Sequence, residues 1–215
     1  MHMVDHVKQQ RDGGRPRRPY RLGRRQPAVD QMRERITAAT FELHATVGPS
    51  RTTIRAIADR AGVQRHTVYH HFPDLETLYQ ACTEHGIRVT GMPTAAGWSA
   101  IDDPAARLRH ALTEMFAWYR ANERMLNNVM SDFDPTAPPP SIPDPFEIRM
   151  GELLDALGAD WATDDPPPAV LGAVLAHAVA FETWRSLTGG GLTDAGAIDI
   201  LVALAVGVAD GSIPP

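Results

Sequence analysis

Cysteine and long apolar segments are nearly absent from this sequence, and each absence excludes a class of protein. The 215 residues include a single cysteine, Cys82, which excludes an intramolecular disulfide and fits a reducing compartment. No run of 18 or more apolar residues occurs, so no membrane-spanning helix is predicted. The opening residues, MHMVDHVKQQ, lack the apolar stretch of a signal peptide. We therefore expect a cytoplasmic protein with no membrane partner.

Enzyme motifs are also missing. The sequence contains no GxSxG motif and no P-loop with its lysine, and no pair of carboxylates has a reason to converge. The glycines at 189–191 follow a helical pattern rather than a strand, so we expect a turn there and not a phosphate-binding loop. Cys82 lies on the apolar face of a predicted helix and is expected in the core. The sequence predicts no enzyme, no catalytic residue and no cofactor.

Charge is distributed unevenly along the chain. Residues 1–90 hold 15 Lys and Arg against 9 Asp and Glu, a net charge of +6, whereas residues 91–215 hold 6 against 17, a net charge of −11. Residues 1–27 are polar, contain several Gly, Pro and Arg, and show no apolar periodicity, which predicts a disordered basic arm. A basic front and an acidic back indicate that only the front meets a polyanion. The alternative is a basic tail on an otherwise ordinary domain.

Strand-like alternation of apolar and polar residues is absent too, and helical spacing takes its place from Ala28 onwards. Gly and Pro divide the pattern into segments, and polar caps begin several of them. The predicted helices cover residues 28–47, 54–61, 65–71, 75–89, 104–122, 123–133, 146–158, 169–187 and 194–210. We therefore predict an all-α fold, in which a small N-terminal unit of three helices precedes a larger helical unit.

Residues 62–72, GVQRHTVYHHF, gather many hydrogen-bonding side chains on one short amphipathic segment. The small Ala61 and Gly62 before it let two helices meet closely, which is typical of a helix-turn-helix unit. Val63, Val68 and Phe72 are expected to hold the second helix on the core. The side chains left facing outwards suit the base edges and phosphates of a major groove. They are Gln64, Arg65, His66, Thr67, Tyr69 and His70.

A metal site is the competing interpretation of two of these histidines. His66 and His70 have the i, i+4 spacing of paired metal ligands on one helix face. A zinc hydrolase of the HExxH type needs a glutamate after the first histidine, and Thr67 stands there instead. The surrounding sequence suggests no third ligand, so we predict no metal.

Residues 53–78, TIRAIADRAGVQRHTVYHHFPDLETL, resemble the DNA-binding signature of the tetracycline-repressor (TetR) family. The matching positions are Thr53, Ile57, Ala58, Ala61, Gly62, Val63, Thr67, Tyr69, His71, Phe72, Glu76 and Leu78. The departures are Gln64 for serine, His66 for glycine, Asp74 for serine and Leu75 for lysine. The resemblance is strong over about residues 28–85, and beyond them it concerns chain length and helical layout.

This resemblance implies a homodimer whose recognition helices read a near-palindromic operator in double-stranded DNA. By position, Thr53 and Tyr69 are expected to contact phosphates. The residues expected at or near bases are Gln64, Arg65, Thr67 and His70. Leu75 replaces a lysine that often holds the DNA backbone in relatives, and we expect the basic arm to substitute for that contact. The predicted DNA-contacting residues are Arg24, Arg25, Thr52, Thr53, Arg55, Gln64, Arg65, His66, Thr67, Tyr69 and His70.

The acidic back of the chain is then expected to supply a dimer interface and a ligand pocket. The candidate interface is a pair of apolar helical stripes, formed by Val170, Leu171, Val174, Leu175, Ala178, Ile198, Leu201, Val202 and Ala205. The candidate pocket lining is mainly Met and aromatic and suits a hydrophobic or aromatic effector. It comprises Met115, Phe116, Trp118, Tyr119, Met125, Met130, Phe133, Phe146, Met150, His177 and Phe181. Residues at helical spacing are equally typical of plain core, and that alternative stays open for both sets.

The leading interpretation is a ligand-responsive DNA-binding repressor. It divides the chain into a disordered basic arm at 1–27, a helix-turn-helix domain at 28–74 and a helical regulatory and dimerisation domain at 75–215. Ligand is expected to shift the helix that begins near Leu75, alter the spacing of the two recognition helices and release DNA. The alternative is a helical, dimeric ligand-binding protein with weak or lost DNA binding, which Leu75 and His66 favour.

Overall fold

The computed structural model describes residues 25–132, 141–161 and 169–213, and every regular element within those ranges is helical. The predicted all-α fold is confirmed. The elements are α1 (Arg25–Val47), α2 (Ile54–Ala61), α3 (Arg65–His71), α4 (Leu75–Thr90), η2 (Ala95–Gly97), α5 (Pro104–Met130), α6 (Pro145–Gly158), α7 (Ala169–Ala178), α8 (Phe181–Gly189) and α9 (Asp194–Ala209). None of the helices in the described ranges is long and apolar enough to cross a membrane.

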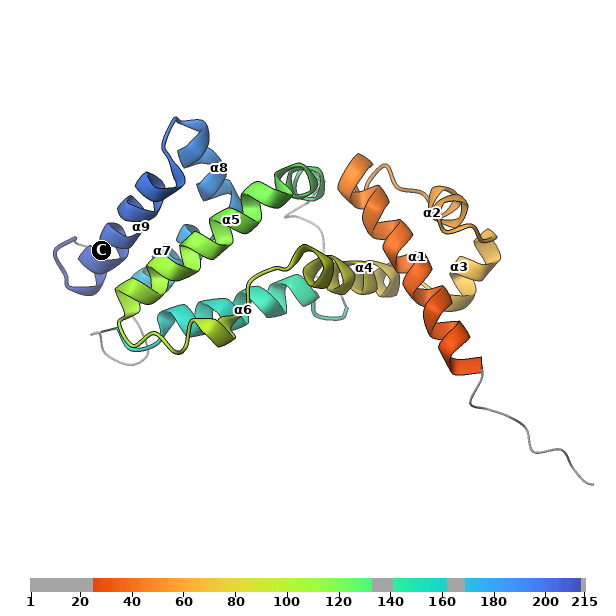
Figure 1. The fold of residues 1–215 in the computed structure, drawn as a ribbon, viewed down its shortest axis with the longest axis horizontal. Coiled ribbons are helices and arrows are strands. Elements are labelled where there is room, and N and C mark those ends of the chain that lie inside the picture. The colour runs from red at the N-terminus through yellow and green to blue at the C-terminus, as the bar shows by residue number, and fades with distance from the viewer. Residues whose placement is uncertain (1–24, 133–140, 162–168, 214–215) are drawn as a thin grey trace, which may run out of the picture.

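The first three helices enclose a small core of their own. α1 lies across α2 and α3, and Ile36, Ile57, Val68 and Phe72 fill the space between them (Figure 1). Local chemistry sets the helix ends, as the sequence predicts. The Thr53 hydroxyl accepts a hydrogen bond from the N–H of Ala56 at the start of α2. Gly62 ends α2 in the left-handed region, at φ 65°, where a side chain would be strained.

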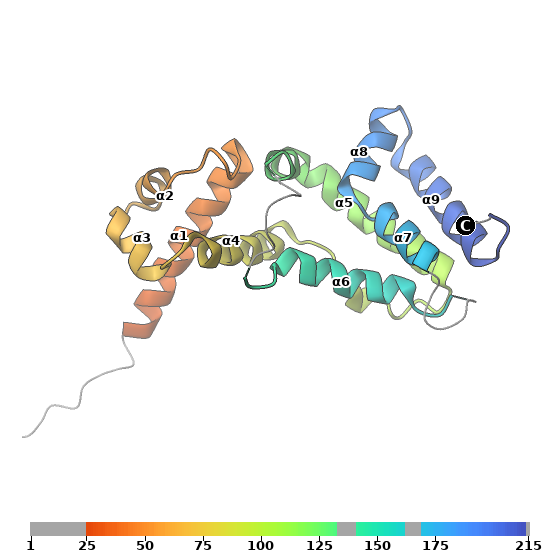
Figure 2. The ribbon, with the colours of Figure 1, turned by 180° about the vertical axis from the view of Figure 1, so that it is seen from behind.

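Helix α4 joins this small core to the rest of the chain. Asp74 caps its first turn by accepting from the N–H of Thr77. Leu78, near its start, is fully buried in the N-terminal core, whereas Ile87, near its end, packs against the C-terminal core. α4 contacts both α1 and α6, so a movement of α4 reaches both parts of the molecule (Figure 2).

The larger core is built around α5, the longest helix. α5 contacts α6, α8 and α9, and α7 packs between α6 and α9 (Figure 1). Large buried side chains occupy this core, among them Trp98, Leu112, Met115 and Trp184. Arg107 is also buried there, with its guanidinium donating to the carbonyls of Ile101, Ala156 and Ala159 and to the Asp160 carboxylate. These bonds satisfy a buried charge that would otherwise be costly.

Two expected helix boundaries are wrong. Residues 104–130 form one helix rather than two, because no glycine or proline interrupts them. The expected helix at 169–187 is broken after Ala178, and Ala180 is extended, at ψ 138°. The break frees the carbonyl of Val179, and the buried hydroxyl of Tyr119 donates a hydrogen bond to it. No glycine or proline stands at this break. The backbone carbonyl that the break frees is satisfied by a tertiary hydrogen bond instead.

Candidate nucleic-acid interface

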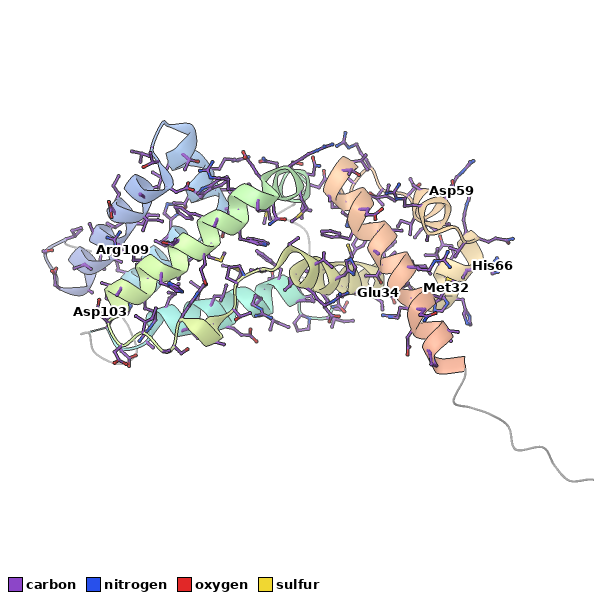
Figure 3. All side chains as sticks on the ribbon, in the orientation of Figure 1. Met32, Glu34, Asp59, His66, Asp103 and Arg109 are labelled. Atoms are coloured by element: carbon purple, nitrogen blue, oxygen red, sulfur yellow. The ribbon has the colours of Figure 1, made fainter. Side chains whose placement is uncertain are left out.

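The short helix α3 presents a polar face to solvent at the outer end of the molecule. Gln64 stands at its N-cap position, where its side chain makes no capping bond. Gln64, Arg65, His66 and His70 are exposed, and Tyr69 is 55% exposed despite its large ring. Figure 3 shows His66 pointing away from the C-terminal helices. An exposed ring beside charged and amide side chains is a chemically suitable face for bases and phosphates.

Buried anchors hold that face in place. Val68 is fully buried on the opposite side of α3, and Phe72, directly after the helix, is 1% exposed. Val63 is half-buried against the same core, and its N–H donates to the carbonyl of Ala58. The three anchors are the ones expected from the sequence. They fix which side of α3 faces outwards, since rotating the helix exposes apolar area.

The remaining residues predicted to contact DNA differ in their exposure and in whether their polar groups are already hydrogen-bonded. Thr53 is exposed, and its oxygen accepts the α2 cap bond, which leaves its hydroxyl proton for a phosphate. The Thr52 hydroxyl donates to the carbonyl of Gly48, so its proton is already used. Arg55 is exposed and lies 3.7 Å from Asp59. Arg24 lies outside the described residues, and Arg25 begins α1 but its side chain is not described. Thr67 is half-buried on α3.

The histidines of α3 show no sign of a metal centre. His70 and His71 pack edge to face, with ring centroids 5.4 Å apart. Burial lowers the pKa of His71, and the nearby His70 and Arg33 lower it further. Across the described ranges, no three His, Cys, Asp or Glu side chains are grouped closely enough to hold a metal ion. His66 and His70 therefore stay candidates for DNA contact.

Two arginines on α1 make contacts that the sequence did not reveal. Arg33 Nη1 donates to the carbonyl of His71 at 2.8 Å, and Arg35 Nη2 donates to the carbonyl of Ala61 at 2.5 Å. These carbonyls belong to the last residues of α3 and α2. In the sequence the two arginines look like ordinary solvated charges beside the apolar stripe of α1. Only the fold shows that both reach a helix end.

Residues at the end of α5 form hydrogen bonds with the end of α1 and with the turn between α1 and α2. Both oxygens of Asp132 accept hydrogen bonds from Ser50, one from its N–H at 2.9 Å and one from its hydroxyl at 2.8 Å. The Asn128 amide donates to the carbonyl of Ala45 at 2.8 Å. We call these four residues the α5 clasp. It gives the C-terminal helices a second connection to the helix-turn-helix unit, separate from α4.

Nine of the eleven predicted pocket residues lie in the C-terminal core or pack against it. Met115, Phe116, Tyr119 and Phe181 are 0 to 3% exposed, and the rings of Tyr119 and Phe181 stack edge to face at 5.4 Å. A second group packs against this core while partly exposed: Met125, Met130, Phe146 and Met150. His177 is exposed, and Phe133 lies outside the described residues. This placement favours the core alternative for the first group.

Two surface grooves occur next to α4. One, of about 570 Å³, is lined by Trp118 of the predicted set together with Thr90, Met92 and Glu114. The other, of about 770 Å³, lies between α4 and α6. Its walls combine apolar residues such as Ile87, Met92 and Ile148 with the charged Arg88 and Arg149. Both grooves adjoin the helix that connects the two cores.

The predicted dimer stripes also turn inwards. Seven of the nine residues are buried in the core of this one chain: Leu171, Leu175, Ala178, Ile198, Leu201, Val202 and Ala205. Val174 is half-buried, and Val170 is 38% exposed. Except for Val170, the hydrophobic residues that the two helices turn outwards are not those of the predicted stripes. The outward residues are Val170, Ala173 and Ala176 on α7 and Ile200, Ala203 and Val206 on α9.

Comparisons with known proteins agree with this description of the interface. A family model described as bacterial regulatory proteins, tetR family, matches residues 36–82, which include the second half of α1, all of α2 and α3 and the first half of α4. The chain is 26% identical over 136 residues to the HTH-type transcriptional regulator BetI of Burkholderia thailandensis, covering 63% of this chain and 70% of that one. These similarities concern regulators and not enzymes.

Solved structures show the same fold. A tetR-family transcriptional regulator from Streptomyces coelicolor superposes with a TM-score of 0.62 at 18% identity, covering 86% of this chain and 84% of that one. A candidate fatty acid metabolism regulator from Clostridium perfringens superposes with a TM-score of 0.55 at 17% identity, covering 84% of this chain and 100% of that one. At these identities the likeness concerns architecture.

Proposed function

We propose, from the premise that this chain belongs to the TetR family of DNA-binding transcriptional regulators, that it is a ligand-responsive repressor acting as a homodimer on a palindromic operator. The observation that carries the DNA-reading part is the polar face of α3, held outwards by buried Val68 and Phe72. Arg65 and Gln64, with the neighbouring His66, Thr67 and His70, lie at bases, and Tyr69 and Thr53 at phosphates.

The proposal for Thr52 changes in one respect. Its hydroxyl donates to the carbonyl of Gly48, so its contribution to binding is to shape the turn before α2. Arg55 is exposed in the first turn of α2 and is proposed as a phosphate contact. Arg24 and Arg25 of the basic arm are proposed to reach phosphates or the adjacent minor groove.

The test begins with selection of duplexes from a random-sequence library by the full-length protein, followed by fluorescence anisotropy with the enriched duplex and a scrambled one. Arg65→Ala is expected to lower affinity for the enriched duplex about tenfold or more and to relax the preference at one position. Arg109→Ala is the matched control. It also removes one exposed arginine, but at the far end of the molecule (Figure 3). Equal effects of the two substitutions, or no enriched duplex, would contradict the proposal.

The dimer is proposed to form through the outward faces of α7 and α9 rather than through the buried stripes. Ile200 is 50% exposed and Val206 36% exposed on α9, and Val170 lies on α7. Small residues between them, such as Ala173 and Ala203, allow two copies of the helices to approach closely. A two-fold axis here places one recognition helix on each side, as a palindrome requires.

The effector is proposed to act through α4. The groove between α4 and α6 offers apolar walls for a hydrophobic or aromatic small molecule, whereas Met115 and Tyr119 of the predicted set are buried. An occupant there separates α4 from α6, and α4 packs directly on α1. Release of DNA requires different affinities of the effector for the two positions of α4. No cofactor is part of this mechanism.

The predicted domain division is kept as a proposal with one refinement. Residues 28–74 form the helix-turn-helix domain and residues 75–215 the regulatory and dimerisation domain, with residues 1–27 as a basic arm outside the described structure except for the first residues of α1. α4 serves both domains, because Leu78 completes the N-terminal core. We propose a cytoplasmic location, where the operator is.

A further inference from the structure

We propose that Arg33 and Arg35 are positioning residues for DNA recognition, which hold the ends of the two helices of the helix-turn-helix at fixed places on α1. This inference rests on the proposed DNA binding by α3. Neither arginine belongs to the outward face of α3. Their role is to fix where that face stands relative to the rest of the domain.

Arg33 holds the end of the recognition helix at two points. Its Nη1 donates to the carbonyl of His71, the last residue of α3, at 2.8 Å. Its guanidinium carbon lies 4.1 Å from the centre of the Phe72 ring, the anchor that follows the helix. A carbonyl at a helix end lacks an intrahelical partner and carries partial negative charge, so a cation there is favoured. The stacking on Phe72 adds a cation–π contact.

Arg35 holds the end of the preceding helix. Its Nη2 donates to the carbonyl of Ala61, the last residue of α2, at 2.5 Å. Gly62 follows in the left-handed region, and a Cβ there would lie 3.4 Å from the same guanidinium nitrogen. Arg35 therefore closes over the turn at the point where the chain changes direction from α2 to α3.

The spacing of the two arginines explains how they act together. Residues at i and i+2 leave an α-helix in nearly opposite directions, so Arg33 reaches α3 while Arg35 reaches α2. Ile36, next in the chain, is fully buried between them. Two side chains of α1 thus fix the positions of the ends of α2 and α3 relative to α1. With seven residues, α3 has few internal bonds and depends on such tertiary contacts for its position.

The alternative role for both arginines is direct phosphate contact. A phosphate contact needs only positive charge, whereas the contacts described above depend on where the guanidinium nitrogens lie and, for Arg33, on its flat face over the Phe72 ring. Lysine keeps the charge, but its compact ammonium does not reproduce the stacking or the position of the donating nitrogen. Arg33→Lys and Arg35→Lys therefore separate the two roles without changing the net charge of the domain.

The test measures Arg33→Lys and Arg35→Lys by fluorescence anisotropy with the selected duplex and the scrambled duplex, each over a series of salt concentrations. We expect affinity for the selected duplex to fall about tenfold, with affinity for scrambled DNA and the salt slope unchanged. Arg60→Lys is the matched control, since Arg60 also bridges α2 to α1, through exposed Glu42, but holds no helix end. It is expected to leave both affinities unchanged.

A second readout does not depend on DNA. Amide hydrogen exchange of residues 65–71 is expected to accelerate in Arg33→Lys and to stay at the wild-type rate in Arg60→Lys. Unchanged exchange in Arg33→Lys, or an equal loss of affinity for both duplexes, overturns the positioning role. A wild-type protein that prefers no duplex overturns the proposed function instead, and the exchange rates then decide the positioning role alone.

Discussion

His44 is a buried imidazole with an incomplete set of hydrogen bonds. It lies on α1, and its Nδ1 is 3.6 Å from Cys82 Sγ of α4, while its Nε2 has no hydrogen-bond partner among the described residues. Burial raises the pKa of the Cys82 thiol to about 12, so the thiol is protonated. In either tautomer of the neutral ring, Nε2 is a buried polar atom without a hydrogen-bond partner among the described residues. Such an atom costs stability, and a charged ring there would cost more.

The pKa of His44 predicts how stability depends on pH. Desolvation lowers it from 6.5 to about 4, against the opposing attraction of Asp132. Between pH 6.5 and 4 the unfolded chain binds a proton at this site and the folded chain does not, so stability falls as the pH falls through this window. The loss is about 3 kcal/mol at most, because each pKa unit corresponds to about 1.4 kcal/mol.

The measurement is urea denaturation of wild type and His44→Gln at pH 7 and at pH 4.5. Glutamine keeps a polar group but does not titrate in this range, so the wild type is expected to lose clearly more stability between the two pH values. The difference between the two proteins isolates His44 from carboxylates such as Asp132 and Asp74, whose pKa values are lowered by hydrogen bonds. Identical pH dependence in both proteins would show that His44 is not neutral and buried in solution.

At the scale of elements, the α5 clasp depends on a backbone conformation that only glycine adopts readily. Gly48 has a φ of +90°, and a Cβ there would lie 2.7 Å from Asp132 Oδ2. Two separate costs therefore oppose a side chain at this position. One is the left-handed conformation itself, worth about 1–2 kcal/mol. The other is displacement of the carboxylate that accepts both bonds from Ser50.

Gly48→Ala is expected to destabilise the protein by about 2–3 kcal/mol, the sum of these two effects. Gly91→Ala is the matched control, because Gly91 also has a positive φ, +64°, but a Cβ there meets nothing within 4 Å. It is expected to show the conformational cost alone. In a double-mutant cycle, Asp132→Ala should reduce the cost of Gly48→Ala toward that of Gly91→Ala. Additive effects of Gly48→Ala and Asp132→Ala in urea denaturation would show that the clasp does not form.

The helix boundaries show which structural features could be predicted from the sequence. The bounds of α3, the Asp74 cap and the left-handed Gly62 were predicted because each follows from the chemistry of a few neighbouring residues. For the α2 cap the sequence offered both Thr52 and Thr53, and Thr53 forms it. The break after Ala178 was not predicted, because the donor that satisfies it, Tyr119, lies 60 positions away. The same applies to Arg33, Arg35 and Asp132, whose partners are distant in sequence. Local rules find helix ends, and only the folded chain shows which side chains reach them.

For the candidate dimer interface, the sequence did not predict which apolar residues are buried within the chain. The stripes on 169–187 and 194–210 have the right period for an interface, but a period shows only that a face is apolar. It does not show whether that face meets the same chain or another copy. Leu171 and Leu201 meet their own chain, and Val170 and Ile200 do not. The polar face of α3 was easier to predict, since polar residues beside buried anchors leave one orientation.

At the scale of the whole molecule, charge and shape orient the protein on DNA. The front of the chain, residues 1–90, carries +6 and the remainder −11. Figure 1 shows α1, α2 and α3 at one end and α9 at the other. Residues 1–24 account for +5 of the +6 and lie outside the described residues, so the described part of the first end is close to neutral. Phosphates repel the acidic second end, which disfavours binding through its helices. The gradient does not select a sequence, so the specific part of recognition is left to α3 and to the proposed pairing of two copies.

That pairing makes oligomeric state and DNA binding one linked prediction. Ile200 on α9 is 50% exposed, and Ile148 on α6 is 52% exposed, so the two are matched in type and exposure. Ile200→Asp places a charge in the proposed interface and is expected to give monomers in analytical ultracentrifugation and to weaken binding to the selected palindrome at least 100-fold. Ile148→Asp adds the same charge outside the interface, at the groove between α4 and α6, and serves as the control for oligomeric state, with the dimer expected to stay intact.

Binding to a half-site duplex distinguishes loss of pairing from loss of folding. A monomer of Ile200→Asp that still reads a half-site with the weak affinity of one wild-type recognition helix has kept its N-terminal domain, so the lost affinity belongs to the second copy. A dimeric Ile200→Asp with wild-type affinity would move the interface away from α9. The exposed face of α7 around Val170 would then be the next surface to test, because it is the other hydrophobic face that the last helices leave uncovered.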